Sequence, residues 1–210
     1  MAIICPTITA YDPHEYRAQI EQIENFAERI HVDMMDGMFT SRQSVDLEHV
    51  WWPDNITADI HLMYQRPGEV IDGLVKHNPS LVVIHYEADA DHRKLAAQLR
   101  DHDIKAGLAI LQDTEVEEVL QLLESFDHVL VFSGKLGFHG GQADLRYLEK
   151  VNLIREKFPK IEISWDGGIN DKNAKQLVDA GVDVLNTGGS IQNSTDPQSA
   201  YATLKSVIEG

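Results

Sequence analysis

The sequence of 210 residues predicts a single (β/α)8 barrel domain spanning residues 1–210. Short apolar segments typical of strands alternate with segments whose apolar residues recur at helical spacing, and this pair of patterns repeats eight times. No long linker and no change in composition interrupts the alternation. Parallel strands joined by helices close into a barrel at about this chain length. A doubly wound open sheet is the alternative, but it seldom contains eight evenly spaced units.

The first half of the chain contains four of the expected strands and three of the expected helices. Tyr16, Ile20 and Ile23 recur at helical spacing, and Pro67 suits the first turn of a helix. A less regular stretch beginning at Asp46 predicts one or two helical turns. We therefore expect strands at residues 3–8, 29–34, 57–63 and 81–86, and helices at about residues 13–27, 67–77 and 90–102.

In the second half of the chain, capping residues and a glycine mark the ends of the expected helices. Asp113 or Thr114 is expected to cap a helix that reaches residue 125. Residues 170–171 are expected to cap a helix ending at residue 180, where Gly181 suits the C-terminus. Asp196 and Pro197 open the last helix. The remaining predicted elements are strands at residues 105–110, 128–132, 161–165 and 182–185 and a helix at residues 144–158.

The composition excludes several classes of partner. Eighteen basic and 34 acidic residues give a net charge of -16, which argues against binding to nucleic acid or to an anionic membrane. A phosphorylated substrate is still compatible, because backbone N–H groups can hold phosphate. The single cysteine, Cys5, cannot form an internal disulfide, which fits a reducing compartment. The first residues are typical of a strand rather than a signal peptide, and no apolar run approaches the ~20 residues of a membrane span. We therefore expect a cytoplasmic protein.

Acidic and imidazole side chains occupy strand positions that face the predicted barrel interior. Alternate residues of a strand share a face, so His31 and Asp33 point away from the apolar residues beside them. His61 and Asp166 likewise oppose the apolar residues of their own strands. All four lie near the C-terminal ends of strands, where barrel enzymes carry their active sites. Such groups are costly to bury without partners, and two histidines with two aspartates are suitable ligands for one metal ion.

Each of these residues also has a purely structural interpretation. His31 and Asp33 would be ordinary surface residues on an edge strand, but a closed barrel has no edge. His61 alone would suit a core histidine with satisfied hydrogen bonds, and Asp166 would suit a turn before two glycines. His85, at the end of the next strand, either supports the site or packs at the barrel rim. The shared position of the first four at strand ends favours the functional interpretation.

Three glycine clusters follow the sixth, seventh and eighth predicted strands. Glycine lets backbone N–H groups approach a ligand closely, and the loops after strands seven and eight of such barrels commonly bind phosphate. A single pair of glycines is weak evidence because turns use the same residue, but three clusters on one face predict a phosphate site. The clusters contain Gly137, Gly140 and Gly141, then Gly167 and Gly168, then Gly188 and Gly189.

Several motifs resemble the ribulose-phosphate 3-epimerase family, and the match runs nearly end to end. The most specific is His31-Val32-Asp33-Met34-Met35-Asp36-Gly37 followed by Phe39. Later motifs occur in the family's order: His61-Leu62-Met63, His85-Tyr86-Glu87-Ala88, Gly137-Phe138-His139-Gly140-Gly141-Gln142 and Trp165-Asp166-Gly167-Gly168-Ile169. The resemblance implies a (β/α)8 barrel and an isomerase of carbohydrate metabolism, in the pentose phosphate pathway. Its expected reaction inverts C3 of a ketose phosphate, converting ribulose 5-phosphate to xylulose 5-phosphate.

The resemblance also implies roles for individual residues. One divalent metal ion, commonly zinc or ferrous iron, with manganese and cobalt as alternatives, is expected to be held by His31, Asp33, His61 and Asp166. Asp33 and Asp166 are implied to be the acid/base pair, because inverting a carbon beside a carbonyl needs a base on one face and an acid on the other. A bound cation stabilises the charge of the enediolate. The residues expected to contact substrate are Thr7, Met35, Met63, His85, Gly137, Phe138, His139, Gly140, Gly141, Gly167, Gly168, Gly188 and Gly189.

Several positions depart from the family's pattern at the substrate end. Thr7 stands where serine is usual and keeps a hydroxyl group. The segment Ser133-Gly134-Lys135-Leu136 lacks the usual proline before Gly137, and the other departures are Arg42, Phe132, His139 and Gly189. The four expected ligands are intact, so the alternatives are the same reaction on another ketose phosphate, such as a hexulose 6-phosphate, and a catalytically silent barrel that binds a phosphorylated ligand. The resemblance further implies a homo-oligomer. Trp51, Trp52 and Tyr64 are candidate contributors, with packing in the core as the alternative role for these side chains.

Overall fold

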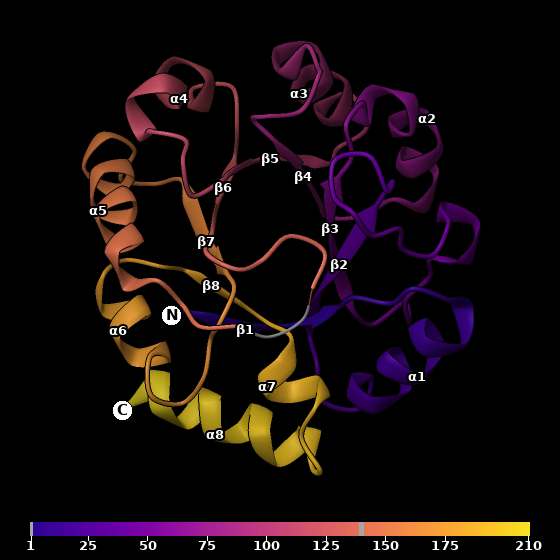
Figure 1. Cartoon of the computed structure of the whole chain (residues 1–210), viewed down its shortest axis with the longest axis vertical. Helices are drawn as coiled ribbons and strands as arrows, with labels where there is room; N and C mark the ends of the chain where they lie inside the picture. Colours follow the sequence, from indigo (N-terminus) through magenta and orange to yellow (C-terminus); the bar gives the residue numbers. More distant parts are fainter. Residues whose placement is uncertain (1, 139–140) are drawn as a thin grey trace.

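The computed structural model describes residues 2–138 and 141–210, and its eight parallel strands close into a barrel. Each strand pairs with the next one in sequence, and β8 pairs with β1. In Figure 1 the strands form the centre of the molecule and the helices surround them. The predicted (β/α)8 fold is confirmed. The strands are β1 (Ile3–Ile8), β2 (Arg29–Met35), β3 (Thr57–Met63), β4 (Leu81–His85), β5 (Lys105–Ile110), β6 (His128–Phe132), β7 (Glu162–Asp166) and β8 (Val184–Thr187).

The helices cover the outer face of the barrel, and the main apolar core lies between them and the strands. Within the described residues, no helix is both long and apolar enough to cross a membrane. The α-helices are α1 (Pro13–Ile23), α2 (Ile71–Leu74), α3 (His92–Arg100), α4 (Val116–Leu123), α5 (Leu148–Lys157), α6 (Ala174–Asp179), α7 (Gly189–Gln192) and α8 (Pro197–Glu209). Short 3-10 helices occur at η1 (Leu47–His49), η2 (Pro67–Glu69), η3 (Val75–His77) and η4 (Leu145–Tyr147).

The segment predicted as one helix at residues 67–77 is instead divided into η2, α2 and η3. Gly68 and Gly73 lie within it, and glycine is a poor former of continuous α-helix. Asn78 then ends the segment in the left-handed conformation, with φ of 52°. The periodicity of the sequence does not predict α7, because four residues are too few to display a helical repeat.

One predicted helix cap is wrong, and another caps a turn that precedes its helix. The Thr114 hydroxyl donates to Glu87, and α4 is capped one residue later by Glu115, whose backbone N–H donates to the Glu118 carboxylate at 3.2 Å. In the loop after β7, Asn170 Oδ1 accepts from the Lys172 backbone N–H at 2.9 Å, as predicted for a cap. The turn that it caps covers residues 170–173, and α6 begins after that turn. Both segments carry several capping residues close together, and the other contacts of these side chains decide which one caps.

The barrel interior has an apolar side and a polar side. A buried apolar cluster comes from β4, β5 and β6 and consists of Leu81, Val83, Ala109, Leu130 and Phe132. Buried polar side chains come mainly from the other strands and include Thr7, His31, Asp33, Asp59, His61, Ser164 and Asn186. Strand register places Asp33 level with His61, and Asp166 level with Asn186. The polar groups of neighbouring strands therefore meet inside the barrel.

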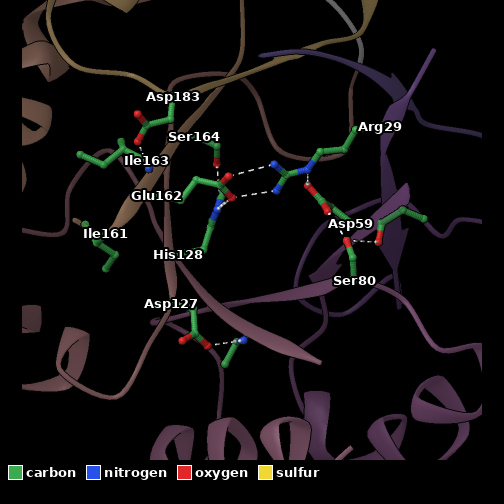
Figure 2. Close-up of polar contacts among 12 residues, drawn as sticks. Arg29, Asp59, Ser80, Asp127, His128, Ile161, Glu162, Ile163, Ser164 and Asp183 are labelled. Atoms are coloured by element: carbon green, nitrogen blue, oxygen red, sulfur yellow. Dashed lines mark hydrogen bonds and ion pairs between the residues drawn. The ribbon is translucent and has the colours of Figure 1, made fainter. Parts of the chain in front are cut away.

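An ion-pair network crosses the N-terminal end of the barrel (Figure 2). Arg29, at the start of β2, donates to both carboxylate oxygens of Glu162, at the start of β7, and to Asp59 at 2.7 Å. His128 Nδ1 lies 2.8 Å from Glu162 Oε2, and its Nε2 lies 2.7 Å from Ser164 Oγ. These groups satisfy one another, so charge pairs join the strands at this end of the barrel.

Candidate active site

Four side chains converge at the C-terminal end of the barrel interior. One ligand atom from each of His31, Asp33, His61 and Asp166 lies within 4.8 Å of every other. His31 Nε2 is 3.4 Å from Asp33 Oδ1 and 3.5 Å from Asp166 Oδ2. His61 Nδ1 is 3.0 Å from Asp33 Oδ1 and 3.8 Å from Asp166 Oδ2. The sequence predicted this convergence, because each residue faces inward near the C-terminal end of its strand.

The donor set fits a divalent cation. His31 Nε2 is buried and has no hydrogen-bond partner among the described residues, although two carboxylates face it. Ligand atoms about 2.0–2.1 Å from a tetrahedral zinc ion lie roughly 3.3 Å apart, close to the separations found between these imidazole nitrogens and carboxylate oxygens. Two imidazoles and two carboxylates also match the ligand preference of zinc and ferrous iron.

The two carboxylates strongly favour a proton or another cation at His31. Burial alone would lower the pKa of His31, but Asp166 and Asp33 outweigh it and raise that pKa to about 10. Burial would raise the pKa of Asp33, but the His31 and His61 imidazoles hold it well below its usual range. The site therefore holds negative charge that needs a positive partner, which a proton or a metal ion supplies.

Thr9 orients Asp33 and was not singled out in the sequence. Its hydroxyl donates to Asp33 Oδ2 at 2.6 Å, while Asp33 Oδ1 faces His61. Both oxygens of this carboxylate are therefore held in place. The available signal was periodicity, because Thr9 follows Thr7 by two residues and continues the inward face of β1.

His85 lies behind His61, away from the two aspartates. Its Nε2 is 2.8 Å from His61 Nε2, and its Nδ1 is 3.4 Å from Glu87 Oε2. Burial lowers the pKa of His85 to about 4, so it is neutral at neutral pH. Burial alone would raise the pKa of Glu87, but His85 and Thr114 lower it to about 2, so this carboxylate is charged.

A cavity of about 260 Å³ opens beside the two aspartates. The predicted site residues that line it are Thr7, Asp33, Met63, Gly137, Phe138, Gly141, Asp166, Gly167, Gly168, Gly188 and Gly189. Met35 and His85 are buried and are not among its lining residues, while His139 and Gly140 lie outside the described residues. Lining residues that the sequence did not single out as substrate contacts are Thr9, Phe132, Gly134, Lys135, Ile169, Asn170, Asn186, Ser190 and Asn193.

Two glycines of the cavity wall have conformations and neighbours that require glycine. Gly167 has φ of 112°, and a Cβ there would collide with the backbone of Gly134. Gly168 has φ of 72°, and a Cβ there would collide with the backbone of Ala143. The loop after β7 therefore presents bare backbone to the cavity, next to the residues that follow β8.

A model of the ribulose-phosphate 3 epimerase family matches residues 3–192. The chain belongs to this family. A ribulose-phosphate 3-epimerase of Helicobacter pylori is 31% identical over 97% of this chain and 97% of its own length. A protein of Oryza sativa named as the cytoplasmic isoform of ribulose-phosphate 3-epimerase is 26% identical over 100% of this chain and 95% of its own length. The predictions of this family and of an isomerase acting on carbohydrates are confirmed.

The barrel also matches a solved structure of low sequence identity. The 3-hexulose-6-phosphate synthase of Salmonella typhimurium superimposes with a TM-score of 0.75 at 13% identity, covering 98% of each chain. At this identity the likeness concerns the fold alone. The family membership therefore rests on the sequence match.

Proposed function

We propose that this epimerase inverts C3 of ribulose 5-phosphate to give xylulose 5-phosphate, with Asp33 and Asp166 as the acid/base pair. One observation carries the proposal: carboxylate oxygens of both residues flank the same buried nitrogen, His31 Nε2, at 3.4 and 3.5 Å, and both residues line the cavity. Two acid/base groups beside one substrate position are what inversion requires.

Proton transfer in this reaction is balanced between the two aspartates. One carboxylate takes the proton from C3, and the electron pair of the broken C–H bond moves into the enediolate. The other aspartate, in its acid form, then delivers a proton to the opposite face of C3. The product is inverted at C3, and the two aspartates have exchanged protonation states. Thr9 holds the Asp33 carboxylate in one orientation while this occurs.

His31, Asp33, His61 and Asp166 are the residues that would hold one divalent metal ion. Zinc or ferrous iron suits this ligand set best, with manganese and cobalt as alternatives. When bound, such an ion supplies Lewis-acid stabilisation of the negative charge that develops on the substrate oxygens. His31 Nε2, which has no hydrogen-bond partner in the described part of the chain, and the closely spaced carboxylates support this assignment.

The substrate is proposed to bind with its phosphate against the glycine backbone and its sugar carbons near the aspartates. The bare backbone at Gly167 and Gly168, together with Gly188 and Gly189, supports the phosphate position. Met63 and Phe132 give the cavity apolar walls beside the planar enediolate. Met35 and His85 are proposed to act from behind the cavity wall rather than by touching substrate.

A different ketose phosphate, such as a hexulose 6-phosphate, is the second candidate substrate. Phe132, which departs from the family's pattern, and Lys135, in the segment that lacks the usual proline, both line the cavity. Lys135 Nζ lies 4.3 Å from the centroid of the Phe138 ring, which places a positive charge beside the cavity. Such changes alter the shape and charge offered to the sugar chain without replacing any of the four proposed ligands.

Deuterium incorporation from solvent at C3 tests these proposals. Purified, metal-loaded protein is incubated in D2O with a panel of ketose phosphates, and exchange is followed by NMR. We expect exchange and inversion at C3 of ribulose 5-phosphate. Exchange on a hexulose 6-phosphate alone would reassign the substrate, and absence of exchange on every ketose phosphate would support a catalytically silent barrel.

We also propose that the protein works in the cytoplasm as a homo-oligomer. The name of the rice relative supports the first part of this proposal. Trp51, with 36% of its surface exposed, supports the second as a candidate contact between subunits. Sedimentation at micromolar concentration tests the assembly, and a clean monomer would contradict it.

A further inference from the structure

We propose that Glu87, acting through His85, is a positioning residue that keeps the proton of His61 on Nε2 and so leaves His61 Nδ1 free to bind the metal ion. The inference rests on the proposed function, because it concerns the proposed metal site. Glu87 follows β4, and it is not among the residues that line the cavity. Its effect on the site must therefore pass through His85.

The contact between the two histidines fixes one donor and one acceptor. Their Nε2 atoms lie 2.8 Å apart, and both side chains are fully buried. A neutral imidazole carries its proton on one nitrogen only, so one ring must donate and the other must accept. If His61 binds a cation through Nδ1, its proton lies on Nε2. His85 Nε2 must then accept that proton, and the proton of His85 must lie on its own Nδ1.

The contact between His85 and Glu87 favours this same arrangement. His85 Nδ1 faces Glu87 Oε2 at 3.4 Å, and neither atom has a hydrogen-bond partner among the described residues. A carboxylate can only accept, so it stabilises His85 with the proton on Nδ1. Glu87 therefore disfavours the alternative tautomer, in which His85 would turn an N–H group toward His61.

The loop after β5 holds the Glu87 carboxylate in this orientation. Glu87 Oε1 accepts from the Leu111 backbone N–H at 2.9 Å and from the Thr114 hydroxyl. Lys150 Nζ fixes the same loop by donating to the backbone carbonyls of Leu111 and Thr114, at 2.9 and 2.7 Å. With Oε1 occupied, Oε2 is the oxygen left for His85. This is the arrangement by which an outer carboxylate orients a metal-ligating histidine.

The substitution Glu87→Gln tests the inference because it keeps the shape of the side chain. The Leu111 N–H needs the amide oxygen, so the amide NH2 group is left facing His85 Nδ1. We expect the proton of His85 to move to Nε2, seen by nitrogen NMR of 15N-histidine-labelled protein. We expect zinc affinity, measured by competition with a chelator, to fall about 10- to 100-fold. The melting temperature of the metal-free protein should change little.

Lys150→Met is the matched control, because it removes support from the same loop without changing any proton donor or acceptor near His85. Its zinc affinity and histidine tautomers should match those of the unsubstituted protein. Equal zinc affinity in Glu87→Gln and the unsubstituted protein would overturn this inference alone, since Glu87 would then only join two loops. Finding the proton of His85 on Nε2 in the unsubstituted, zinc-loaded protein would also overturn this inference, and this measurement needs no variant. Failure of the unsubstituted protein to bind zinc would overturn the proposed metal site and this inference together.

Discussion

Arg29 and Glu162 lie 133 positions apart in the sequence and form a two-point ion pair across the N-terminal end of the barrel, with N–O distances of 3.0 and 2.8 Å. Only 12% of the Arg29 side chain is exposed to solvent, so its charge must be compensated by partners within the protein. The ion pair joins β2 and β7, and the same two strands carry His31, Asp33 and Asp166 farther along their length. The ion pair therefore contributes to the alignment of the strands that form the site.

Glu162→Gln is expected to destabilise the fold. The change leaves the largely buried Arg29 with Asp59 as its remaining carboxylate partner, and loss of one member of a buried ion pair costs about 3–5 kcal/mol. Partial exposure of Glu162 should reduce this to about 2–3 kcal/mol in urea unfolding. Glu156→Gln, which removes an exposed ion pair with Lys157, is the control and should cost less than about 1 kcal/mol. Equal effects of the two substitutions would contradict the structural role of Glu162.

The Glu162 carboxylate should also make the free energy of unfolding decrease in acid. Burial would raise the pKa of Glu162, but His128 and Arg29 hold it well below the usual 4.5. A carboxylate with a lowered folded-state pKa stabilises the fold above its unfolded-state pKa, and that contribution is lost as the pH falls toward the folded-state value. The unfolding free energy of the natural chain should therefore decrease more between pH 6 and pH 3 than that of Glu162→Gln. If the unfolding free energies of the natural chain and of Glu162→Gln decrease equally over this pH range, Glu162 makes no such contribution.

Asp166→Asn is expected to remove most of the proton exchange at C3. The amide cannot serve as a proton donor or acceptor of comparable strength, and such groups contribute about 10²- to 10⁴-fold to rates. Circular dichroism and melting temperature should show an intact fold. Asp171→Asn changes an exposed aspartate in the following loop and should leave exchange unchanged. Retained turnover in Asp166→Asn would remove its assigned role.

Metal binding should release a proton from His31. With a pKa of about 10 in the metal-free protein, His31 is protonated at neutral pH, and a ligated imidazole nitrogen cannot carry that proton. Zinc affinity should therefore rise with pH, approaching tenfold per pH unit below the pKa. Calorimetry in two buffers of different ionisation enthalpy measures how many protons are released for each zinc ion bound. If zinc binding releases no proton at pH 7, His31 is not protonated in the metal-free protein and this prediction is contradicted.

Gly167→Ala should impair both stability and phosphate binding. The positive φ of 112° and the collision of the new Cβ with the Gly134 backbone should cost about 1–3 kcal/mol and displace the loop after β7. The Michaelis constant for ribulose 5-phosphate should rise. Gly68→Ala is the control, because its Cβ would meet only Leu95, at 3.7 Å. Normal substrate affinity in Gly167→Ala would place the phosphate elsewhere.

Much of the fold and the four proposed ligands could be predicted because strand periodicity is a local property. The alternation in residues 29–35 already places His31 and Asp33 on one face, and parallel strands bring the C-terminal ends of that face together. The helix boundaries at Thr114 and Asn170 were less predictable. Each lies among several capping residues, and a contact with another loop or with a nearby asparagine decides between them.

The sequence by itself determined the order of strands and helices, the inward face of each strand, and the family to which the chain belongs. Only the tertiary structure decided that Arg29 meets Glu162, that Thr9 holds Asp33, and that Glu87 reaches His61 through His85. The physical reason is that periodicity depends on neighbouring residues along the chain, whereas these contacts depend on the closure of the barrel. A hydrogen bond forms only when two particular atoms from distant segments come within about 3 Å in the right orientation.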